Sequence, residues 1–263
     1  MTSPSPLVSP QGASYELRDV PAFSPFAWLV RGWDDFRAAP VASGFYGAAF
    51  AAMGWALLAL YDFAYQYVTT LAGAFLLAAP FLATGLYALS RDREAGRKPR
   101  LLASLTAWRE NMGGLGIYVL VITVIFLVWA RASLVTFALF STGPMPDLRN
   151  FLAKAFSLGN IEFVIVYFAA GAMFATLVFA VSVVSVPMML DRGNDAVSAA
   201  ILSVQVLAKN PGAMAVWAFV IVLLTGIGLA TAFVGLVLTM PVIGHATWHA
   251  YRDCVAWGEG DPP

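Results

Sequence analysis

The chain has 263 residues, of which 60% are hydrophobic and only 11% are charged, with a mean hydropathy of +0.77. Soluble domains carry about 25% charged residues, so this composition excludes a soluble globular protein and indicates a polytopic membrane protein. Equal numbers of acidic and basic side chains give a net charge of zero, which indicates no nucleic-acid partner. The single cysteine, Cys254, excludes an internal disulfide and a cysteine-based metal cluster.

The two ends of the chain predict cytoplasmic tails. Residues 1–24 are rich in proline and serine, which is typical of a disordered segment. They lack the basic start, the apolar core and the cleavage site of a signal peptide, so we expect the first crossing to serve as an uncleaved insertion signal. Residues 256–263 are expected to form the second tail.

The middle of the chain, residues 25–255, predicts a single all-α membrane domain with six transmembrane helices. A crossing needs about 20 predominantly apolar residues. The block from Gly212 to Tyr251 contains no Asp, Glu, Lys or Arg and is too long for one crossing, so we divide it at Thr225–Gly228. The six predicted spans are Val41–Tyr61, Val68–Ser90, Gly113 to about Ala130, Ile161 to about Val183, Met214 to about Thr225 with its extension, and Thr231–Tyr251.

An amphipathic segment precedes each pair of spans. Its apolar residues recur at helical spacing, which predicts a helix lying in the plane of the membrane interface. In the first segment Arg31, Asp34 and Asp35 lie away from the apolar stripe, and Pro40 and Pro211 are expected to end the first and third helices. The three stripes are Phe26, Leu29, Trp33 and Phe36; Leu101, Leu105, Trp108 and Met112; and Val197, Ile201, Val204 and Ala208.

These elements predict three repeats of one unit, an interfacial helix followed by a helical hairpin. The interval from Pro80 to Arg91-Asp92 equals the interval from Pro241 to Arg252-Asp253. The middle unit has a shorter interval after its proline, and its two charges are reversed. The three units cover about 25–92, 100–192 and 194–253.

The basic residues predict the orientation. Twelve of the 15 lysines and arginines fall on one side of the predicted spans, and only Arg131, Arg149 and Lys154 fall on the other. The positive-inside rule then predicts a multi-pass protein of the bacterial inner membrane with both termini in the cytoplasm. Residues 141–158 predict a short surface helix on the outer side.

Two histidines are the first candidates for chemistry. His245 and His249 share one face of the last predicted span, so both could reach a haem or a metal ion. The chain has no further histidine, and the corresponding positions of the first repeat hold Thr84 and Ala88. Hydrogen-bonding or interfacial histidines are therefore the favoured interpretation, with no cofactor expected and haem or metal ligation as the alternative.

Two carboxylates are candidates for a polar pathway. Asp62 lies in the predicted outer turn between the first two spans, and Glu162 begins the fourth span. Carboxylates inside a membrane serve proton relays and ion sites, but both of these lie at predicted boundaries, close to water. No charged residue falls near the middle of a predicted span, which disfavours a proton-driven pump or an ion-coupled carrier.

The loop after the second span is basic. We expect it chiefly to set the topology, and it could also attract anionic lipid. Its basic residues are Arg91, Arg93, Arg97, Lys98 and Arg100.

Three segments carry a family likeness: Phe26–Asp35 with its Gly-Trp-Asp-Asp end, the stretch from Pro80 to Asp92, and Trp248–Asp253. They resemble a bacterial family of integral membrane proteins of unknown function, some of whose members are labelled cytochrome c oxidase subunits. The resemblance covers about residues 20–255 and implies no established catalytic residue. An oxidase core needs several histidines on different helices, so the label would fit only an accessory subunit here.

The sequence predicts an integral inner-membrane protein without enzyme activity. It contains no G-x-S-x-G, no phosphate-binding glycine loop and no H-E-x-x-H. The expected role is binding or scaffolding in the lipid bilayer, including service as an accessory subunit of a larger membrane assembly. The alternative is a small-molecule or ion transporter or channel whose path runs between the repeats.

Overall fold

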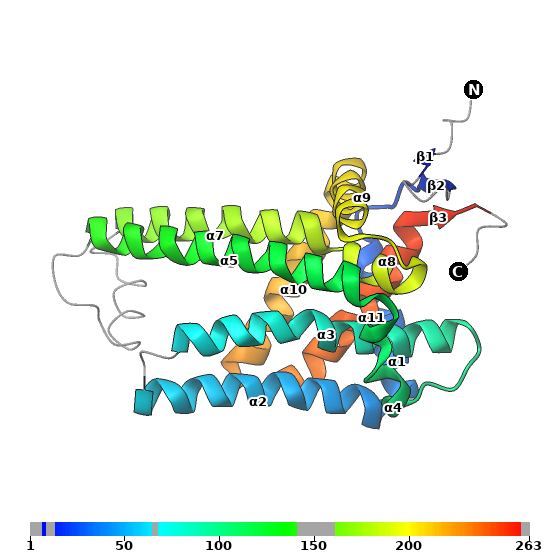
Figure 1. Cartoon of the computed structure of the whole chain (residues 1–263), viewed down its shortest axis with the longest axis horizontal. Helices are drawn as coiled ribbons and strands as arrows, with labels where there is room; N and C mark the ends of the chain where they lie inside the picture. Colours follow the sequence, from blue (N-terminus) through cyan, green and yellow to red (C-terminus); the bar gives the residue numbers. More distant parts are fainter. Residues whose placement is uncertain (1–6, 9–13, 65–67, 141–160, 259–263) are drawn as a thin grey trace. The chain divides into compact units, whose positions relative to one another are not determined.

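The computed structural model describes residues 7–8, 14–64, 68–140 and 161–258, and most of them are helical (Figure 1). The chain folds into two compact units. The main unit comprises Met1–Val119 and Ala180–Pro263, and the hairpin unit comprises Leu120–Phe179. The predicted outer surface helix at 141–158 lies outside the described residues.

The all-α prediction is confirmed for the described residues. Four of their helices are long and apolar enough to cross a membrane, whereas the six crossings expected from the sequence stay a prediction. The four are helical stretches: Pro40–Leu60, Leu101–Phe140, Ile161–Arg192 and Pro211–Ala230. The second and third of them each combine more than one of the shorter helices that follow. The helices are α1 (Ser24–Ala38), α2 (Pro40–Ala64), α3 (Val68–Glu94), α4 (Leu101–Ser104), the 3-10 helix η2 (Ala107–Asn111), α5 (Met112–Phe140), α7 (Ile161–Ser182), α8 (Ser185–Arg192), α9 (Ala196–Lys209), α10 (Pro211–Ala230) and α11 (Leu236–Cys254).

Prolines set two of the helix boundaries, as the sequence predicts. Pro40 is the first residue of α2 and Pro211 the first residue of α10, where a missing N–H is tolerated. The start of α9 is fixed by Asp195, whose carboxylate accepts hydrogen bonds of 3.0 Å from the backbone N–H groups of Val197 and Ser198.

The prediction of a break at Thr225–Gly228 is wrong. The helix α10 passes through these glycines because a helix keeps every backbone group bonded where no water is present. The turn comes later, where the Thr231 hydroxyl bonds the end of α10 and accepts the N–H of Gly235 at 2.9 Å. Two residues in this turn, Ala232 and Phe233, have φ angles of 53° and 67°.

The second amphipathic segment does not form one helix either. It is divided into α4 and η2, with a turn between them. The Ser104 hydroxyl donates to the Leu101 carbonyl at 2.8 Å, and the Thr106 hydroxyl donates to the Ala103 carbonyl at 3.1 Å. Such side-chain bonds to nearby carbonyls compete with the α-helical pattern, and a pattern of apolar residues does not reveal them.

The two predicted tails contain strands that the sequence did not indicate. Strand β2 (Ser14–Leu17) pairs antiparallel with β3 (Val255–Trp257), and β1 (Leu7–Val8) pairs with the other edge of β2. The segment after β2 is also held, because Asn210 bonds the backbone of Arg18 at 3.0 Å and of Val20 at 2.8 Å. The backbone before α1 is therefore hydrogen-bonded to β3 and to Asn210.

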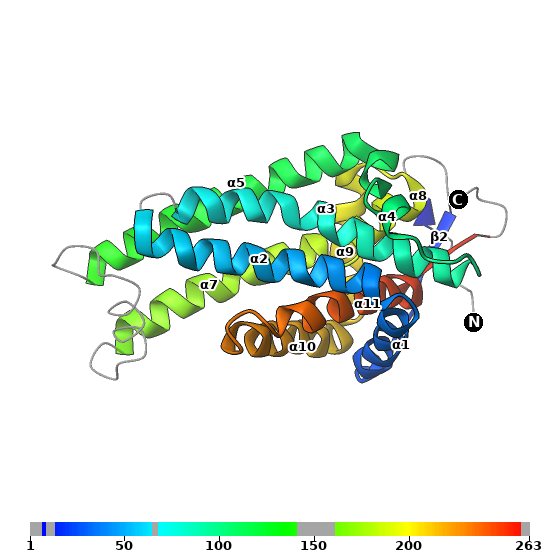
Figure 2. The same cartoon turned by 90° about the horizontal axis from the view of Figure 1, so that it is seen from below.

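The core of the main unit forms around α11. This helix packs against α1, α2, α3, α8 and α10, and its second half is almost entirely buried. Figure 2 shows α10 and α11 side by side, with α1 crossing their end. Because other helices shield α11, its polar residues are kept away from the hydrocarbon part of the bilayer.

A close backbone contact in this core joins α2 to α11 at Gly47. Pro241 has no N–H, so the Val237 carbonyl one turn earlier lacks its usual helical partner. Gly47 lies against that carbonyl, and an added Cβ would be only 2.0 Å from the Val237 oxygen. Glycine and proline therefore act as a pair that brings the two backbones together.

The hairpin unit is held by aromatic contacts. Phe137 of α5 meets Phe163 of α7 edge to face, with ring centroids 6.3 Å apart. The Ser133 hydroxyl donates to the Tyr167 hydroxyl at 3.1 Å. Apart from such contacts the unit exposes apolar side chains, as expected for a membrane hairpin.

We expect Gly47→Ala to lower the thermal stability of the protein in mild detergent, by about 1–3 kcal/mol of unfolding free energy, because the new methyl group overlaps a backbone carbonyl. Gly44→Ala is the matched control on the same helix, since its Cβ would meet nothing within 4 Å. Equal melting temperatures for the two variants would contradict the packing described here.

Candidate functional site

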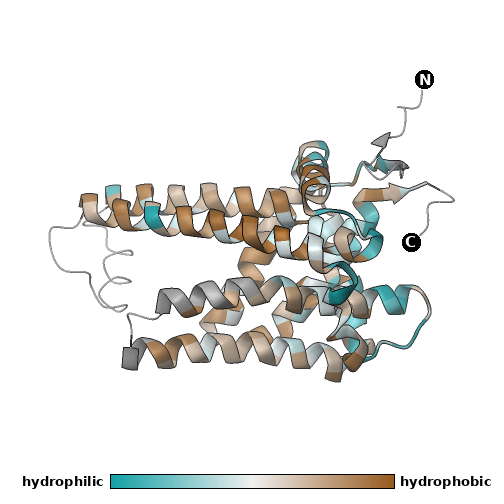
Figure 3. Cartoon of the chain, in the orientation of Figure 1, coloured by the Kyte–Doolittle hydropathy of each residue, from teal (hydrophilic) through white to brown (hydrophobic). Residues whose placement is uncertain are grey.

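Polar residues of the main unit gather where α3, α8 and α11 end (Figure 3). Each of these helices carries an Arg-Asp or Asp-Arg pair in its last turn, and α3 adds Arg93 and Glu94. Two neighbouring sites are formed there. One is a buried hydrogen-bond network, and the other is a pocket rich in arginine.

The buried network is centred on His245 of α11, which is fully buried. Its Nε2 lies 2.9 Å from the Ser43 hydroxyl of α2, and its Nδ1 lies 2.7 Å from the Ser90 hydroxyl of α3. The Ser90 hydroxyl donates its proton to Asp35 of α1 at 2.6 Å. His245 must then donate from Nδ1 and accept the Ser43 proton at Nε2, an assignment that follows from the bonding pattern of a neutral imidazole.

The carboxylate of Asp35 ends this chain of hydrogen bonds and is only 5% exposed. The same carboxylate accepts a bond from Nε2 of His249 at 3.0 Å and pairs with Arg93. Burial opposes its ionisation, but the bonds from His249 and Ser90, the charge of His249 and the bond from Arg93 outweigh burial and lower the pKa of Asp35. We call this set the His245 network: Asp35, Ser43, Ser90, Arg93, His245 and His249.

The geometry limits the chemistry of the His245 network. A serine, a histidine and an aspartate are linked, as in hydrolytic triads, but Ser43 is fully buried and cannot reach a substrate from solution. Both ring nitrogens of His245 are occupied by serine hydroxyls. Within the described residues, no three His, Cys, Asp or Glu side chains are grouped to hold a metal ion. What the arrangement does is join four helices.

Asp35 is the residue that sequence reasoning missed. The sequence placed Asp35 among charged residues away from the apolar stripe of the first helix. In the structure the exposed stripe is the apolar one, and the face with Pro25, Trp28, Gly32 and Asp35 is buried against α11. The signal available was Gly32, because a Cβ there would lie 2.7 Å from the backbone nitrogen of Ala246.

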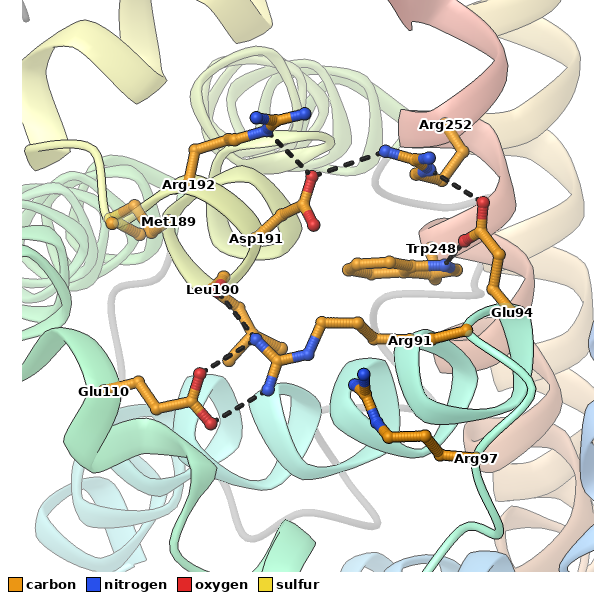
Figure 4. A pocket seen from close by; sticks show the side chains of 12 residues that line it. Arg91, Glu94, Arg97, Glu110, Met189, Leu190, Asp191, Arg192, Trp248 and Arg252 are labelled. Carbon is orange, nitrogen blue, oxygen red and sulfur yellow. Dashed lines mark hydrogen bonds and ion pairs between the residues drawn. The ribbon is translucent and has the colours of Figure 1, made fainter. Parts of the chain in front are cut away.

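The second site is a pocket of about 650 Å³ between α3, η2, α8 and α11. Figure 4 shows Arg91 and Arg97 on one side of it, Arg192 and Arg252 on the other, and Trp248 between them. We call it the arginine pocket; it is lined by Arg91, Glu94, Ala95, Arg97, Glu110, Met189, Leu190, Asp191, Arg192, Gly193, Trp248 and Arg252.

Arg91 is the most firmly held cation of the arginine pocket. Its two Nη atoms donate to the two carboxylate oxygens of Glu110 at 2.8 and 2.9 Å, and one of them also donates to the Leu190 carbonyl at 3.0 Å. The bond to Glu110 raises the pKa of Arg91 despite partial burial. The bidentate pair joins α3 to η2.

On the opposite wall, Arg252 joins α11 to α3 and α8. Its Nε donates to Glu94 at 3.0 Å, and its Nη1 donates to Asp191 at 3.4 Å. Glu94 also accepts the indole N–H of Trp248 at 2.8 Å, and Asp191 accepts the hydroxyl proton of Tyr251 at 2.7 Å. The Arg-Asp pairs at the helix ends therefore bind neighbouring helices to one another.

The remaining candidates lie elsewhere. The Asp62 backbone belongs to the last turns of α2, but its side chain is outside the described part of the structure. Glu162 is exposed in the first turn of α7, in the hairpin unit. Of the basic loop, Arg93 belongs to the His245 network and Arg97 pairs with Asp92, while Lys98 and Arg100 are exposed.

Comparison with known proteins matches one part of the chain to a membrane family. Residues 67–191 match the model of a family described as "Predicted integral membrane protein (DUF2189)". The chain is an integral membrane protein with several apolar helices. Searches of curated proteins and of solved structures give no match.

The match supports the membrane family expected from the sequence and names no activity. Its description contains no cytochrome c oxidase, so that label stays a prediction. The matched segment includes α3, η2, α5, α7 and most of α8, and thus one part of the arginine pocket but neither histidine.

The lowered pKa of Asp35 makes a pH dependence testable. Asp35→Asn should lower the free energy of unfolding by about 1–3 kcal/mol at neutral pH, because His249, Ser90 and Arg93 lose a charged acceptor. A carboxylate whose pKa is lower in the folded state stabilises the fold above its unfolded pKa of about 4, and this contribution is lost as the pH falls further.

The measurement is thermal unfolding of both proteins in mild detergent as a function of pH. The difference between wild type and Asp35→Asn should shrink below about pH 4. The exposed neighbour gives the control, since Asp34→Asn should change stability by no more than about 0.5 kcal/mol. A difference that is the same at every pH would contradict the role assigned to the ionised Asp35.

Proposed function

We propose that this protein is a non-enzymatic binding or scaffolding protein of the bacterial inner membrane, including service as an accessory subunit of a larger membrane assembly. It holds no resident cofactor in this proposal. The observation that carries it is the uncovered apolar surface of one helix. In the most apolar stretch of Ile161–Arg192 no residue is buried. In the corresponding stretches of the other three candidates, the share of buried residues is 33% for Pro40–Leu60, 22% for Leu101–Phe140 and 28% for Pro211–Ala230.

The face of α7 that its own chain leaves uncovered has to be covered by lipid or by another protein. Small residues favour the second of these, because they let a neighbouring helix approach closely in a bilayer. Gly171 lies in the middle of α7, and a Cβ at this position would meet nothing within 4 Å. The hairpin unit is therefore the proposed contact surface for a partner helix.

The state of the His245 network favours a structural role over transport. Its polar groups bond one another between packed helices instead of lining an open passage. A transporter, the alternative function, would need polar groups that face a water-filled path across the membrane.

We further propose six crossings arranged as three repeats, with both termini in the cytoplasm. The equivalent positions of two small residues support this arrangement. Gly32 and Ser203 lie at the same distance before Pro40 and Pro211, and both are buried. Gly32 faces Ala246 of α11, and the Ser203 hydroxyl accepts the N–H of a residue just before α8 at 3.4 Å, so each interfacial helix rests on the hairpin of another unit.

Exposed apolar side chains support the interfacial position of α1 and α9. Both helices bury one face in the protein and expose apolar residues on the other, which suits a helix lying at the headgroup boundary. The charged loop after α3 would then be at the inner surface, where it can meet anionic lipid. The exposed residues are Phe26, Val30 and Trp33 of α1, and Val197, Ile201 and Val204 of α9.

Mild-detergent isolation at native expression, with mass spectrometry and an optical spectrum of the same sample, tests the proposal. We expect a stoichiometric protein partner and no Soret band. Gly171→Leu should reduce recovery of the partner about tenfold, which corresponds to about 1.4 kcal/mol of lost binding. Gly116→Leu is the matched control on α5, since its Cβ also meets nothing within 4 Å.

Two outcomes would overturn this proposal. One is the absence of any stoichiometric partner together with protein-dependent solute flux in reconstituted vesicles, which would favour the transporter. The other is a Soret band that disappears in His245→Ala or His249→Ala, which would assign haem to the histidine pair.

A further inference from the structure

We infer that the arginine pocket binds the phosphate group of an anionic ligand. The shared chemistry is a phosphate, carried either by the headgroup of an anionic lipid or by a soluble phosphate compound. The inference rests on the proposed function, which puts these helix ends at the inner surface of the membrane. The volume of the pocket, about 650 Å³, is in the range of small-molecule sites.

The charged residues that line the pocket are mostly basic. Four arginines line it against three acids, and the fourth arginine, Arg97, pairs with Asp92 outside the lining, so an anion that displaced this exposed pair would meet an unmatched cation. The acids are also already occupied. Glu110 accepts hydrogen bonds from both Nη groups of Arg91. Glu94 accepts from Trp248 and Arg252, and Asp191 accepts from Tyr251 and Arg252.

The arginines retain N–H groups that a ligand could use. In the described structure the Nε of Arg91 is buried and has no hydrogen-bond partner. Arg252 uses its Nε and Nη1, and no bond of its Nη2 is present among the described residues. The Arg91 Nε is closed to a ligand, so the donors within reach of an oxygen-rich ligand are the Nη2 of Arg252 and the guanidinium of the exposed Arg97. Phosphate suits such guanidinium donors because it offers several acceptor oxygens.

The arginines differ in how freely they can move. The side chain of Arg91 is 23% exposed and fixed by Glu110, whereas the side chain of Arg97 is 59% exposed and pairs with Asp92. An exposed pair of this kind contributes little to stability, so Arg97 can turn toward a ligand. The pocket thus combines a fixed guanidinium at its base with a movable one at its edge.

The position of the pocket relates it to the membrane surface. It lies where the apolar helices α3 and α11 give way to charged residues, and Trp248 in its wall is a residue type enriched at headgroup depth. A lipid phosphate at the inner surface and a phosphate compound in the cytoplasm would both reach this depth. The experiment therefore has one arm for each source.

Ala95 is a suitable position for substitutions that change the charge of the pocket, because it is exposed and lines the pocket. In the lipid arm, native mass spectrometry in neutral detergent measures whether phosphatidylglycerol binds saturably. Equilibrium binding of inorganic pyrophosphate to the same purified protein forms the soluble arm. Ala95→Glu should weaken binding about tenfold and Ala95→Lys should strengthen it, while Ala95→Gln, of similar size and uncharged, should stay near wild type.

A second pair of variants tests the inference without any change at Ala95, in case the Ala95 variants misfold. Arg97→Gln should weaken binding, whereas Lys98→Gln, a neighbouring exposed cation outside the pocket, should not. Saturable binding of either probe with this pattern supports the inference, and the arm that responds identifies the source.

The inference is overturned if neither probe binds saturably, if Ala95→Glu and Arg97→Gln both bind as wild type does, or if Lys98→Gln weakens binding as much as Arg97→Gln. These measurements use the isolated protein and no partner, so their failure is distinct from failure of the proposed scaffolding role.

Discussion

The main unit depends on one constraint, the need to keep the buried carboxylate of Asp35 bonded. An ionised carboxylate at this depth is stable only with several donors around it. Those donors come from α3 and α11, as Ser90, Arg93 and His249, and His245 extends the chain to Ser43 of α2. Because Asp35 itself belongs to α1, its bonding requires α1, α3 and α11 to meet at one place, and the contact between His245 and Ser43 adds α2. The interfacial helix is thereby fixed to the hairpins.

This constraint explains why α11 is both polar and central. Its histidines are acceptable in a membrane protein because α1, α2 and α3 cover them, and Gly32 and Gly47 allow α1 and α2 to approach its backbone. The ends of α3, α8 and α11 are consequently held close together, and their arginines and acids form the walls of the arginine pocket. The hairpin unit presents the contrasting surface, apolar and uncovered along α7.

Much of the helical architecture was predictable from the sequence, because apolar length and proline positions carry it. The starts of α2 and α10 at Pro40 and Pro211 follow from covalent geometry alone. What could not be predicted depends on contacts distant in the sequence. The burial of Asp35 could not be predicted because its partners lie 55 or more positions away, and β2 pairs with the opposite end of the chain. The break at Thr225–Gly228 was wrong because glycine propensities measured in water do not govern a helix shielded from water.

A double-mutant cycle between Asp35→Asn and Ser90→Ala, followed by unfolding in mild detergent, tests whether the bond between these two side chains holds α1 to α3. The two side chains are 2.6 Å apart and belong to α1 and α3. We expect a coupling energy of about 0.5–3 kcal/mol for this pair, and additive effects within about 0.5 kcal/mol when Asp35→Asn is combined with Asp195→Ala at the start of α9. Additive effects of Asp35→Asn and Ser90→Ala would contradict the claim that this network joins the helices.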